Sequence, residues 1–483
     1  MTYKPTIGLE IHLELNTRSK MFCDSPNEPE ERHPNLNVCP VCMAHPGTLP
    51  TINKEAIKKV LKLGLLLGGE IAKHSYFERK NYFYPDLPKG YQISQYHSPL
   101  VKNASLNLKS GKKIKIQRIH LEEDTGRLIH SGKETLVDFN RAGIPLMELV
   151  TEPDFESSQE AKEFAEELRT IVKTLNISSA DMEKGVMRVE ANISLSQNAK
   201  LGTKVEIKNL NSFKAVERAI EYEVERQTEI LASGKKIVQE TRGWDDIEEK
   251  TVSQRIKEES HDYRYFPEPD LPALNLEKDE EFNIEKLRAE LPETPEQKRK
   301  RLKNQYNLEE ELIEILVKDP QILSFFENAV SELMEWAKPE DKKNLTTLAS
   351  NYLKTDLLGL ANEKQISFSE LLLTPENFAE LIKMLVKNEI TSRGAKDVLR
   401  KIIEQGGDPS QIVEELGLKQ ITDEDYLETV VKEVIRDNQK PAEDYKKGKQ
   451  EALQFLIGQT MKQTRGKAKP EVARKLLEKF LKS

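Results

Sequence analysis

Alternating polar and apolar residues dominate the first part of the chain. A period of two, typical of strands with one buried face, runs through GLEIHLEL (8–15), KIKIQRIHL (113–121), MRVEANISL (187–195) and KVEIKNL (204–210). Helical patterns interrupt these stretches at 56–68 and 161–175. The pattern therefore predicts an α+β fold in which a large, mixed or mostly antiparallel sheet forms the N-terminal domain.

The pattern becomes helical after about residue 290. Apolar residues recur at helical spacing in 307–318 and 391–403. In the second stretch a single stripe is formed by Ala395, Val398, Leu399, Ile402 and Ile403. Gly406-Gly407-Asp408-Pro409 interrupts the helical pattern, which resumes at about 411. We therefore expect three domains: a mixed-sheet domain at 1–289, an all-α helical domain at 290–406 and a small all-α tail at 411–483.

Composition narrows the class of protein. Hydrophobic residues make up 37% of the chain and charged residues 32%, and no apolar run approaches the ~20 residues of a membrane span. The first residues lack the pattern of a signal peptide, and all three cysteines fall within 23–42, so neither secretion nor a disulfide framework is expected. These features predict a cytoplasmic protein.

The charge is unevenly distributed along the chain. The net charge is −8, but residues 431–483 carry 14 Lys and Arg against 7 Asp and Glu. A basic tail on an acidic body suggests a polyanionic partner, although a solvated helical surface has the same composition.

Acidic residues are placed on the polar faces of the predicted strands. Glu10 shares a face with His12, while Glu190 and Glu206 lie on the polar faces of two further strands. Oxygen ligands of this kind suit a hard cation such as Mg²⁺. The solvated face of an antiparallel sheet would show the same pattern.

A fourth strand ends in three consecutive acids, Glu122, Glu123 and Asp124. Two carboxylates about 4 Å apart repel by roughly 4 kcal/mol at an effective dielectric constant of 20. Solvent, basic neighbours or a cation has to offset that repulsion, and we favour the cation. The candidate Mg²⁺ ligands are therefore Glu10, His12, Glu122, Glu123, Glu190 and Glu206.

Two loops combine aromatic and basic residues with prolines: RKNYFYPDLPKGYQISQ (79–95) and HDYRYFPEPDLP (261–272). Aromatic rings beside Arg and Lys can stack a base and hold phosphate or sugar oxygens. A structural corner of Tyr and Pro would have the same composition. Neither a Walker A sequence nor GxGxxG occurs in the chain, so a nucleotide would need an unfamiliar arrangement of residues.

Eight motifs in one order over residues 7–272 carry a resemblance to a known family. They are IGLEIHLEL, RKNYFYPDLPKGYQISQ, HLEEDTG, VDFNRAGIPLMELVTEPD, RVEANISL, EIKNLNSFKAVERAIEYE, QETRGWD and DYRYFPEPDLP. The chain resembles the B subunit of the bacterial tRNA-dependent amidotransferase, and residues 437–470 resemble the tail domain of that family. The resemblance covers essentially the whole chain.

The resemblance implies a cradle-shaped, kinase-like domain followed by a helical domain and a tail that binds tRNA. The cradle would use ATP and Mg²⁺ to phosphorylate the side-chain carboxylate of misacylated Glu-tRNA(Gln) or Asp-tRNA(Asn). Ammonia released from glutamine by an A subunit would displace the phosphate, and a small C subunit would complete a heterotrimer. The activity would be that of a glutamine-hydrolysing carbon–nitrogen ligase without a protein nucleophile, because the substrate supplies the attacking carboxylate.

Residues for each ligand follow from the motifs and from the basic tail. The candidates for binding ATP or the aminoacyl group are Lys80, Asn81, Tyr82, Arg141, Lys208, Asn209 and Arg264. The candidates for binding tRNA are Lys446, Lys447, Lys449, Lys462, Arg465, Lys467 and Lys469.

The three cysteines raise a separate question. Cys39 and Cys42 have the spacing of a zinc knuckle, and Cys23 lies sixteen residues upstream of Cys39. Zinc-binding members of the family tend to have a CxC pair upstream, which here reads Cys23-Asp24-Ser25. We expect a Zn²⁺ site with an unidentified fourth ligand, for which the sequence offers His33, His45 and Asp24. A former site held by ordinary packing is the alternative.

Two other functions fit the same residues. In a non-catalytic tRNA-binding scaffold the carboxylates would be a solvated rim, and in a metal-dependent nuclease they would hold ions against a phosphodiester. The sequence does not distinguish Glu-tRNA(Gln) from Asp-tRNA(Asn) as the substrate.

Overall fold

The chain divides into two compact units, Met1–Pro295 and Glu296–Ser483. A computed structural model describes residues 3–198, 200–256, 263–338, 341–420, 424–464 and 466–482. The first unit contains the large sheet, and the named elements of the second are helices over its described residues. The α+β class expected from the sequence is confirmed.

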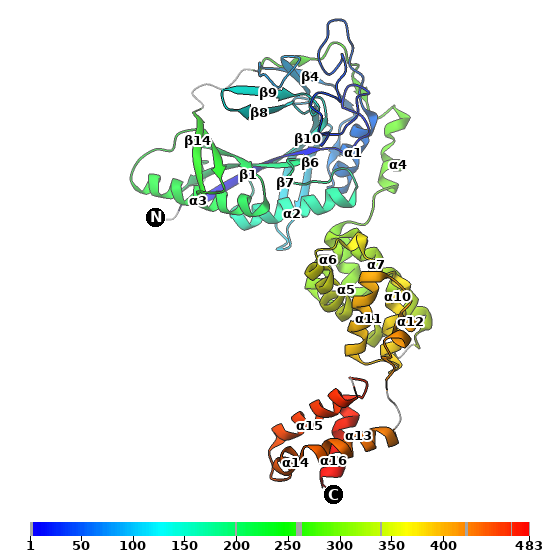
Figure 1. The fold of residues 1–483 in the computed structure, drawn as a ribbon. Helices are drawn as coiled ribbons and strands as arrows, with labels where there is room; N and C mark the ends of the chain where they lie inside the picture. The colour runs from blue at the N-terminus through cyan, green and yellow to red at the C-terminus, as the bar shows by residue number, and fades with distance from the viewer. Residues whose placement is uncertain are drawn as a thin grey trace. The chain divides into compact units, whose positions relative to one another are not determined.

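Nine strands form the central sheet of the first unit (Figure 1). In order across the sheet they are β14 (Lys250–Ile256), β13 (Glu240–Asp245), β12 (Val205–Leu210), β11 (Met187–Ser196), β1 (Lys4–Glu14), β10 (Pro145–Thr151), β7 (Lys113–Glu123), β6 (Val101–Asn107) and β2 (Glu70–Ile71). The β12–β13 pair is parallel, and the other neighbouring pairs in this sheet are antiparallel. The sheet is therefore mixed and mostly antiparallel, as the alternating stretches predict.

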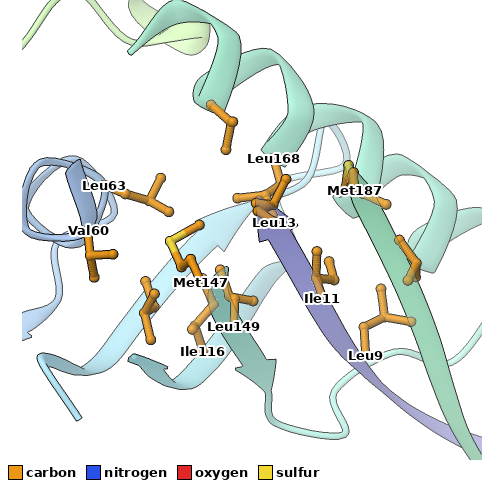
Figure 2. Packing of buried hydrophobic residues seen from close by; sticks show 14 of the residues in the cluster. Leu9, Ile11, Leu13, Val60, Leu63, Ile116, Met147, Leu149, Leu168 and Met187 are labelled. Atoms are coloured by element: carbon orange, nitrogen blue, oxygen red, sulfur yellow. The ribbon is translucent and has the colours of Figure 1, made fainter. Parts of the chain in front are cut away.

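Three helices cover one face of this sheet. They are α1 (Lys54–Leu66), α2 (Ser158–Thr174) and α3 (Phe213–Ala232). Each follows an N-cap residue, Asn53, Ser157 or Ser212, whose side chain accepts hydrogen bonds from backbone N–H groups of the first turn. Leu9, Ile11 and Leu13 of β1 point towards the helices and are fully buried (Figure 2). The period of two therefore sends Glu10, His12 and Glu14 to the opposite, polar face.

Smaller strands stand on the side of that polar face. Figure 1 shows β4, β8 and β9 across the large sheet from α2 and α3. One small sheet has the order β15 (Phe266–Pro267), β4 (Glu78–Asn81) and β5 (Tyr91–Ser94). A hairpin joins β8 (Arg127–Ser131) to β9 (Glu134–Asp138), and β16 (Leu274–Asn275) pairs with the distant β3 (His74–Ser75). A short helix, α4 (Ile284–Ala289), packs on α1.

The second unit is a succession of helices. They are α5 (Pro295–Tyr306), α6 (Glu310–Lys318), α7 (Pro320–Trp336), α8 (Lys342–Asn351), a π-helical turn (Tyr352–Leu357), α9 (Leu358–Lys364), α10 (Pro375–Val386), α11 (Ser392–Gln405), α12 (Pro409–Glu415), α13 (Glu424–Asp437), α14 (Gln439–Lys446), α15 (Gln450–Gln463) and α16 (Pro470–Lys482). None of the helices in the described ranges combines the length and the apolar character that crossing a bilayer requires.

Two separate hydrophobic clusters lie within the second unit. One runs from Leu302 to Val413 and buries the whole stripe of α11, while the other runs from Val430 to Leu481. Gly406 and Gly407 end α11 with φ values of +71° and +116°, which favour glycine. Helix α12, which the sequence divides between the linker and the tail, packs in the first of these clusters. The three domain boundaries themselves stay predictions.

Replacing Ile11 with Ala should lower the free energy of unfolding of the first unit by about 2–5 kcal/mol, because its side chain is fully buried beneath the helices. The chain has two tryptophans, and Trp244 lies in β13 of this unit. Denaturant unfolding followed by fluorescence in a Trp336→Phe background therefore reports on the sheet. Ile129→Ala, at a half-exposed position of β8, is the control and should change stability by less than ~1 kcal/mol. Equal losses would contradict the assignment of the core.

Candidate active site

The pairing register of β1, β10 and β7 brings five ionisable side chains together on the polar face of the sheet. His12 pairs with Glu148, which pairs with His120, while Glu10 and Glu122 are next to them on their strands. His12 Nε2 lies 3.5 Å from Glu148 Oε2, 3.7 Å from Glu122 Oε1 and 3.8 Å from Glu10 Oε1. His120 Nε2 lies 3.7 Å from Glu148 Oε2. We call Glu10, His12, His120, Glu122 and Glu148 the carboxylate–histidine cluster.

This cluster has the donor set of a divalent-cation site. The potential ligand atoms of Glu10, His12 and Glu148 lie within 4.8 Å of one another, and so do those of His120, Glu122 and Glu148. Glu122 and Glu148 are only 3% and 6% exposed. Within the described part of the chain, Glu122 Oε2 and His120 Nδ1 are buried without a hydrogen-bond partner. Unpaired buried acceptors are costly, and a cation held by these oxygens and nitrogens would satisfy them.

Mutual interactions shift the pKa values within the cluster. Burial lowers the pKa of His12, but the hydrogen bond and charge of Glu148, with Glu122 and Glu10, raise it to about 9. Burial and then the charge of Glu148 raise the pKa of Glu10 to about 7. For Glu148, burial is outweighed by His120 and His12, and its pKa is lowered. Ligands must release protons to bind a metal, so the cluster should bind a cation less well as the pH falls.

A rim of paired charges adjoins the cluster. Glu190 is the register partner of Glu10, and its Oε2 accepts a hydrogen bond of 2.7 Å from Lys208 Nζ. The Lys208 ammonium also lies 3.6 Å from Glu206 Oε1, and Glu206 Oε2 accepts a 2.6 Å bond from Thr241 Oγ1. Glu190 and Glu206 are thus near the cluster but are paired with Lys208, which can hold an anionic ligand at the rim.

The side chains of the three consecutive acids, Glu122, Glu123 and Asp124, point in different directions and contact different partners. Glu123 points away from Glu122, accepts a 2.9 Å bond from the Ile93 N–H and forms an ion pair with Lys89. Asp124 accepts a 2.9 Å bond from Arg188 Nη2 and lies 3.8 Å from Arg141. Burial would raise the pKa of Asp124, but these two guanidinium groups hold it at about 2.

Basic neighbours therefore offset the charges of Glu123 and Asp124, while Glu122 lies in the carboxylate–histidine cluster, where the expected cation stays a prediction. The sheet brings only Glu122 to the carboxylate–histidine cluster. Glu123 lies apart from it, because successive side chains of a strand point to opposite faces.

Two members of the cluster are missing from the sequence-based ligand set. Glu148 lies in PLMELVT, where Leu146 and Val150 share its face, so the strand lacks a polar alternation that would single it out. His120 comes just before the three acids in β7. The last residues of this strand are all buried, so their pattern does not show on which face of the sheet the His120 side chain lies. An isolated charge inside an apolar strand is the signal that would have found Glu148.

The two aromatic loops meet beside the cluster. Phe266 pairs with Arg79, and Asn81 Nδ2 donates a 2.8 Å bond to the Arg264 carbonyl. Lys80 Nζ lies 5.2 Å from the centre of the Tyr263 ring. Burial would lower the pKa of Lys80, but Glu122 and other charges raise it, so the ammonium is held in the cationic form. His261 and Asp262 of the second motif lie outside the described residues.

The remaining candidates for binding ATP or the aminoacyl group occupy distinct places. The Tyr82 and Tyr263 rings lie 6.0 Å apart in an edge-to-face arrangement. Asn209 follows Lys208 in β12 with a φ of +65°, which turns the backbone at this point. Arg141 donates to the carbonyls of Thr125 and Gly126 at 3.1 and 2.9 Å. Arg141 is therefore already engaged in holding the loop that follows Asp124.

The three cysteines converge at a second potential metal site. The sulfur atoms of Cys23, Cys39 and Cys42 lie within 4.8 Å of one another. Lys20 Nζ approaches Cys42 Sγ at 3.8 Å. A hydrogen bond from Cys23 and the charge of Lys20 outweigh burial and lower the pKa of the Cys42 thiol to about 4. Three thiols of this kind fit a thiophilic cation such as Zn²⁺.

The fourth zinc ligand is not identified by this arrangement. His33 is exposed, and its Nδ1 forms a hydrogen bond of 2.7 Å with Glu31 Oε1. His45 and Asp24 are exposed as well. In the described residues the potential metal-binding group at this place consists of the cysteines alone.

The basic residues of the tail lie around two turns. Lys446, Lys447 and Lys449 surround Gly448, which has a φ of +96° at the end of α14, and all three are exposed. Lys462 near the end of α15 is also exposed, while Lys467 and Lys469 are partly buried. Lys449 pairs with Asp444 at 3.1 Å. Arg465 lies outside the described residues.

Comparison with known proteins places this architecture in a family. Residues 5–281 match the GatB/GatE catalytic domain, and residues 326–481 match the GatB domain. The chain belongs to the GatB/GatE family.

Full-length relatives carry one and the same description, the B subunit of aspartyl/glutamyl-tRNA(Asn/Gln) amidotransferase. The relative from Thermotoga neapolitana is 45% identical over 492 residues, which cover 100% of this chain and 99% of the relative. The relative from Persephonella marina is 46% identical over 487 residues with 100% of both chains covered, and that from Brevibacillus brevis is 43% identical over 488 residues with 100% and 99% covered. The resemblance that the sequence motifs carry is confirmed.

Replacing Cys42 with Ser should abolish zinc binding, if the three thiols hold the ion. We expect purified wild-type protein to contain about one zinc per chain by elemental analysis, because the thiols are already gathered. The exposed His45→Ala variant should keep its zinc. Stoichiometric zinc in the Cys42→Ser protein, or its loss in His45→Ala, would contradict a site made by the cysteines alone.

Proposed function

We propose that this chain is the B subunit of a tRNA-dependent amidotransferase and phosphorylates the side-chain carboxylate of Glu-tRNA(Gln), Asp-tRNA(Asn) or both. The family membership supports the subunit assignment. The observation that carries the chemical role is the buried carboxylate–histidine cluster with its unpaired Glu122 oxygen. We further propose that it works in the cytoplasm with an amidase A subunit and a small C subunit, as a glutamine-hydrolysing carbon–nitrogen ligase.

The reaction consists of two displacements. An oxygen of the substrate carboxylate attacks the γ-phosphorus of ATP, and the bond from that phosphorus to the ADP oxygen breaks. The nitrogen lone pair of ammonia then attacks the acyl carbon, and inorganic phosphate leaves with the electron pair of the carbon–oxygen bond. The proton released from the attacking nitrogen passes to water. The product is the amide, attached to the same tRNA.

The residues of the cluster and its rim have separate tasks in this chemistry. Glu10, His12 and Glu148 would hold Mg²⁺, with His120 and Glu122 as a second set of donors. When bound there, the cation would neutralise charge on the β- and γ-phosphates. Lys80 and Lys208 place two ammonium groups beside the acids, where they can hold phosphate oxygens. Such chemistry depends on position and charge, and it needs no protein nucleophile.

The tail is proposed to hold tRNA. Its exposed lysines around Gly448 can contact phosphates, and the backbone can approach RNA closely at that glycine. Its hydrophobic cluster, Val430–Leu481, is separate from the cluster of the preceding helices. The tail can therefore be removed without opening the other cores.

Replacing Glu10 with Gln should reduce ATP hydrolysis that depends on misacylated tRNA by about a hundredfold or more, equivalent to about 2.7 kcal/mol in the barrier. Glu10 is chosen because its side chain is partly exposed at the rim, so the fold should persist. Mn²⁺ binding, followed by electron paramagnetic resonance, should weaken in parallel. Glu225→Gln, on the exposed surface of α3, is the matched control. Near-native hydrolysis in the folded Glu10→Gln protein would favour the scaffold function.

Truncation after Gln420 should weaken tRNA binding and flatten its dependence on salt, by roughly 0.7–0.9 in the logarithmic slope for each phosphate that the truncated protein no longer neutralises. The same slope change, to a smaller extent, is expected when Lys446, Lys447 and Lys449 are replaced together by Gln. Binding titrations at several salt concentrations measure both quantities. Equal affinities and slopes for full-length and truncated protein would show that the tail does not hold tRNA.

A further inference from the structure

Ser25 is a buried residue beside the three cysteines. It is 7% exposed, and its Oγ lies 4.0 Å from Cys42 Sγ. The hydrogen bond with Cys42, and then burial, raise the pKa of Cys23, and hydrogen bonds from the N–H and the hydroxyl of Ser25 work against that rise. The Ser25 hydroxyl therefore faces two of the three sulfur atoms.

Main-chain contacts fix the backbone around Ser25. Ser19 and Pro26 form an antiparallel bridge, and the Lys20 N–H donates a 2.9 Å hydrogen bond to the Ser25 carbonyl. The hydroxyl is therefore held beside the sulfur atoms by the local fold. Because a preformed site loses little conformational entropy on binding, this arrangement favours uptake of an ion.

The other candidates for the fourth zinc ligand are placed less favourably than Ser25. His33, His45 and Asp24 are exposed, and His33 is hydrogen-bonded to Glu31. Over the described part of the chain, none of these three belongs to the group of ligand atoms that lie within 4.8 Å of one another at the cysteines. Structural zinc is almost always four-coordinate, so a further donor is needed. Ser25 offers a buried oxygen at this place.

Charge balance favours a neutral fourth ligand. Lys20 is fully buried, and its Nζ lies 3.8 Å from Cys42 Sγ and 3.3 Å from Phe139 O. Burial lowers the pKa of Lys20, and the charges of the thiolates oppose that shift. Zn²⁺ and three thiolates together carry one negative charge, which the Lys20 ammonium offsets. A carboxylate or a fourth thiolate would leave a buried charge unpaired, whereas a hydroxyl adds an oxygen ligand without adding charge.

The cysteine site adjoins the turn that contains Arg141. The Met21 N–H donates a 2.8 Å hydrogen bond to Gly143 O, and the Gly143 N–H donates a 2.9 Å bond to Asp124 O. Gly143 has a φ of +86°, and a Cβ atom there would lie 3.6 Å from Cys42 Cβ. An ion bound by the cysteines would therefore brace this turn.

We infer that the hydroxyl of Ser25 is the fourth ligand of a zinc ion held by the three cysteines. The inference concerns a structural metal site and is independent of the reaction proposed above. Zinc would then have three sulfur ligands at about 2.3 Å and one oxygen ligand at about 2.0–2.2 Å. A neutral oxygen is a weaker and harder donor than a thiolate, so the ion should exchange more readily than in a site of four thiolates.

The test compares Ser25→Ala and Ser25→Cys with Asp24→Ala, a control at the adjacent, exposed position. Each full-length chain is purified, stripped of metal and titrated with Zn²⁺ against a chelator of known affinity. X-ray absorption at the zinc edge then counts the sulfur and oxygen ligands of the bound ion. Thermal unfolding verifies that each variant is folded, and Ser25→Cys keeps the inference testable if Ser25→Ala is unstable.

In the wild type and in Asp24→Ala we expect the same zinc affinity, with three sulfur ligands and one oxygen ligand. The affinity of Ser25→Ala should be lower by about tenfold or more. Ser25→Cys should show four sulfur ligands, because its thiol takes the place of the hydroxyl. Unchanged affinity in Ser25→Ala, or three sulfur ligands in Ser25→Cys, would overturn the inference. A loss of affinity in Asp24→Ala would assign the fourth place to that carboxylate and would overturn it as well, and so would wild-type protein that takes up no zinc.

Discussion

Charge burial in the middle strands of the sheet is the constraint on which the rest of the first unit depends. Glu122 and Glu148 sit on neighbouring strands with almost no exposed surface, where an isolated carboxylate would be strongly destabilising. The arrangement holds because histidines, Lys80 and Arg118 surround the acids, with Arg118 Nη2 at 3.3 Å from Glu148 Oε1. The opposite face contributes the apolar contacts of Leu9, Ile11 and Leu13. The same strands therefore carry the core on one face and the chemistry on the other.

That division explains why neighbouring residues have unrelated roles. Glu122 joins the carboxylate–histidine cluster, Glu123 forms an ion pair with Lys89 in the loop between β4 and β5, and Asp124 contacts Arg188 and Arg141. Each step along the strand turns the side chain to a new environment. A shift of the pairing by one residue would exchange the two faces, so the apolar packing beneath the sheet also fixes which acids can act together.

The sequence predicts well on which face of a strand each side chain lies. It predicts poorly which strands pair with one another. Periodicity places Glu10 and His12 on a polar face, and the helical stripe of α11 is buried as expected. The cluster, however, depends on pairing between β1, β10 and β7, which are separated by long stretches of chain. Glu148 becomes visible only through that register. The motifs indicate the family, but neither they nor the local patterns show which strands pair.

The place of β1 in the sheet also affects how the protein can be made. This strand begins at Lys4, yet its partners β10 and β11 begin at Pro145 and Met187. At 5–20 residues per second, a ribosome needs roughly 6 to 26 s to synthesise the 130 residues between Glu14 and Pro145. During that time the apolar face of the first strand has no sheet to join. The nascent chain should therefore depend on shielding of its N-terminal segment, and folding of the sheet should begin late in translation.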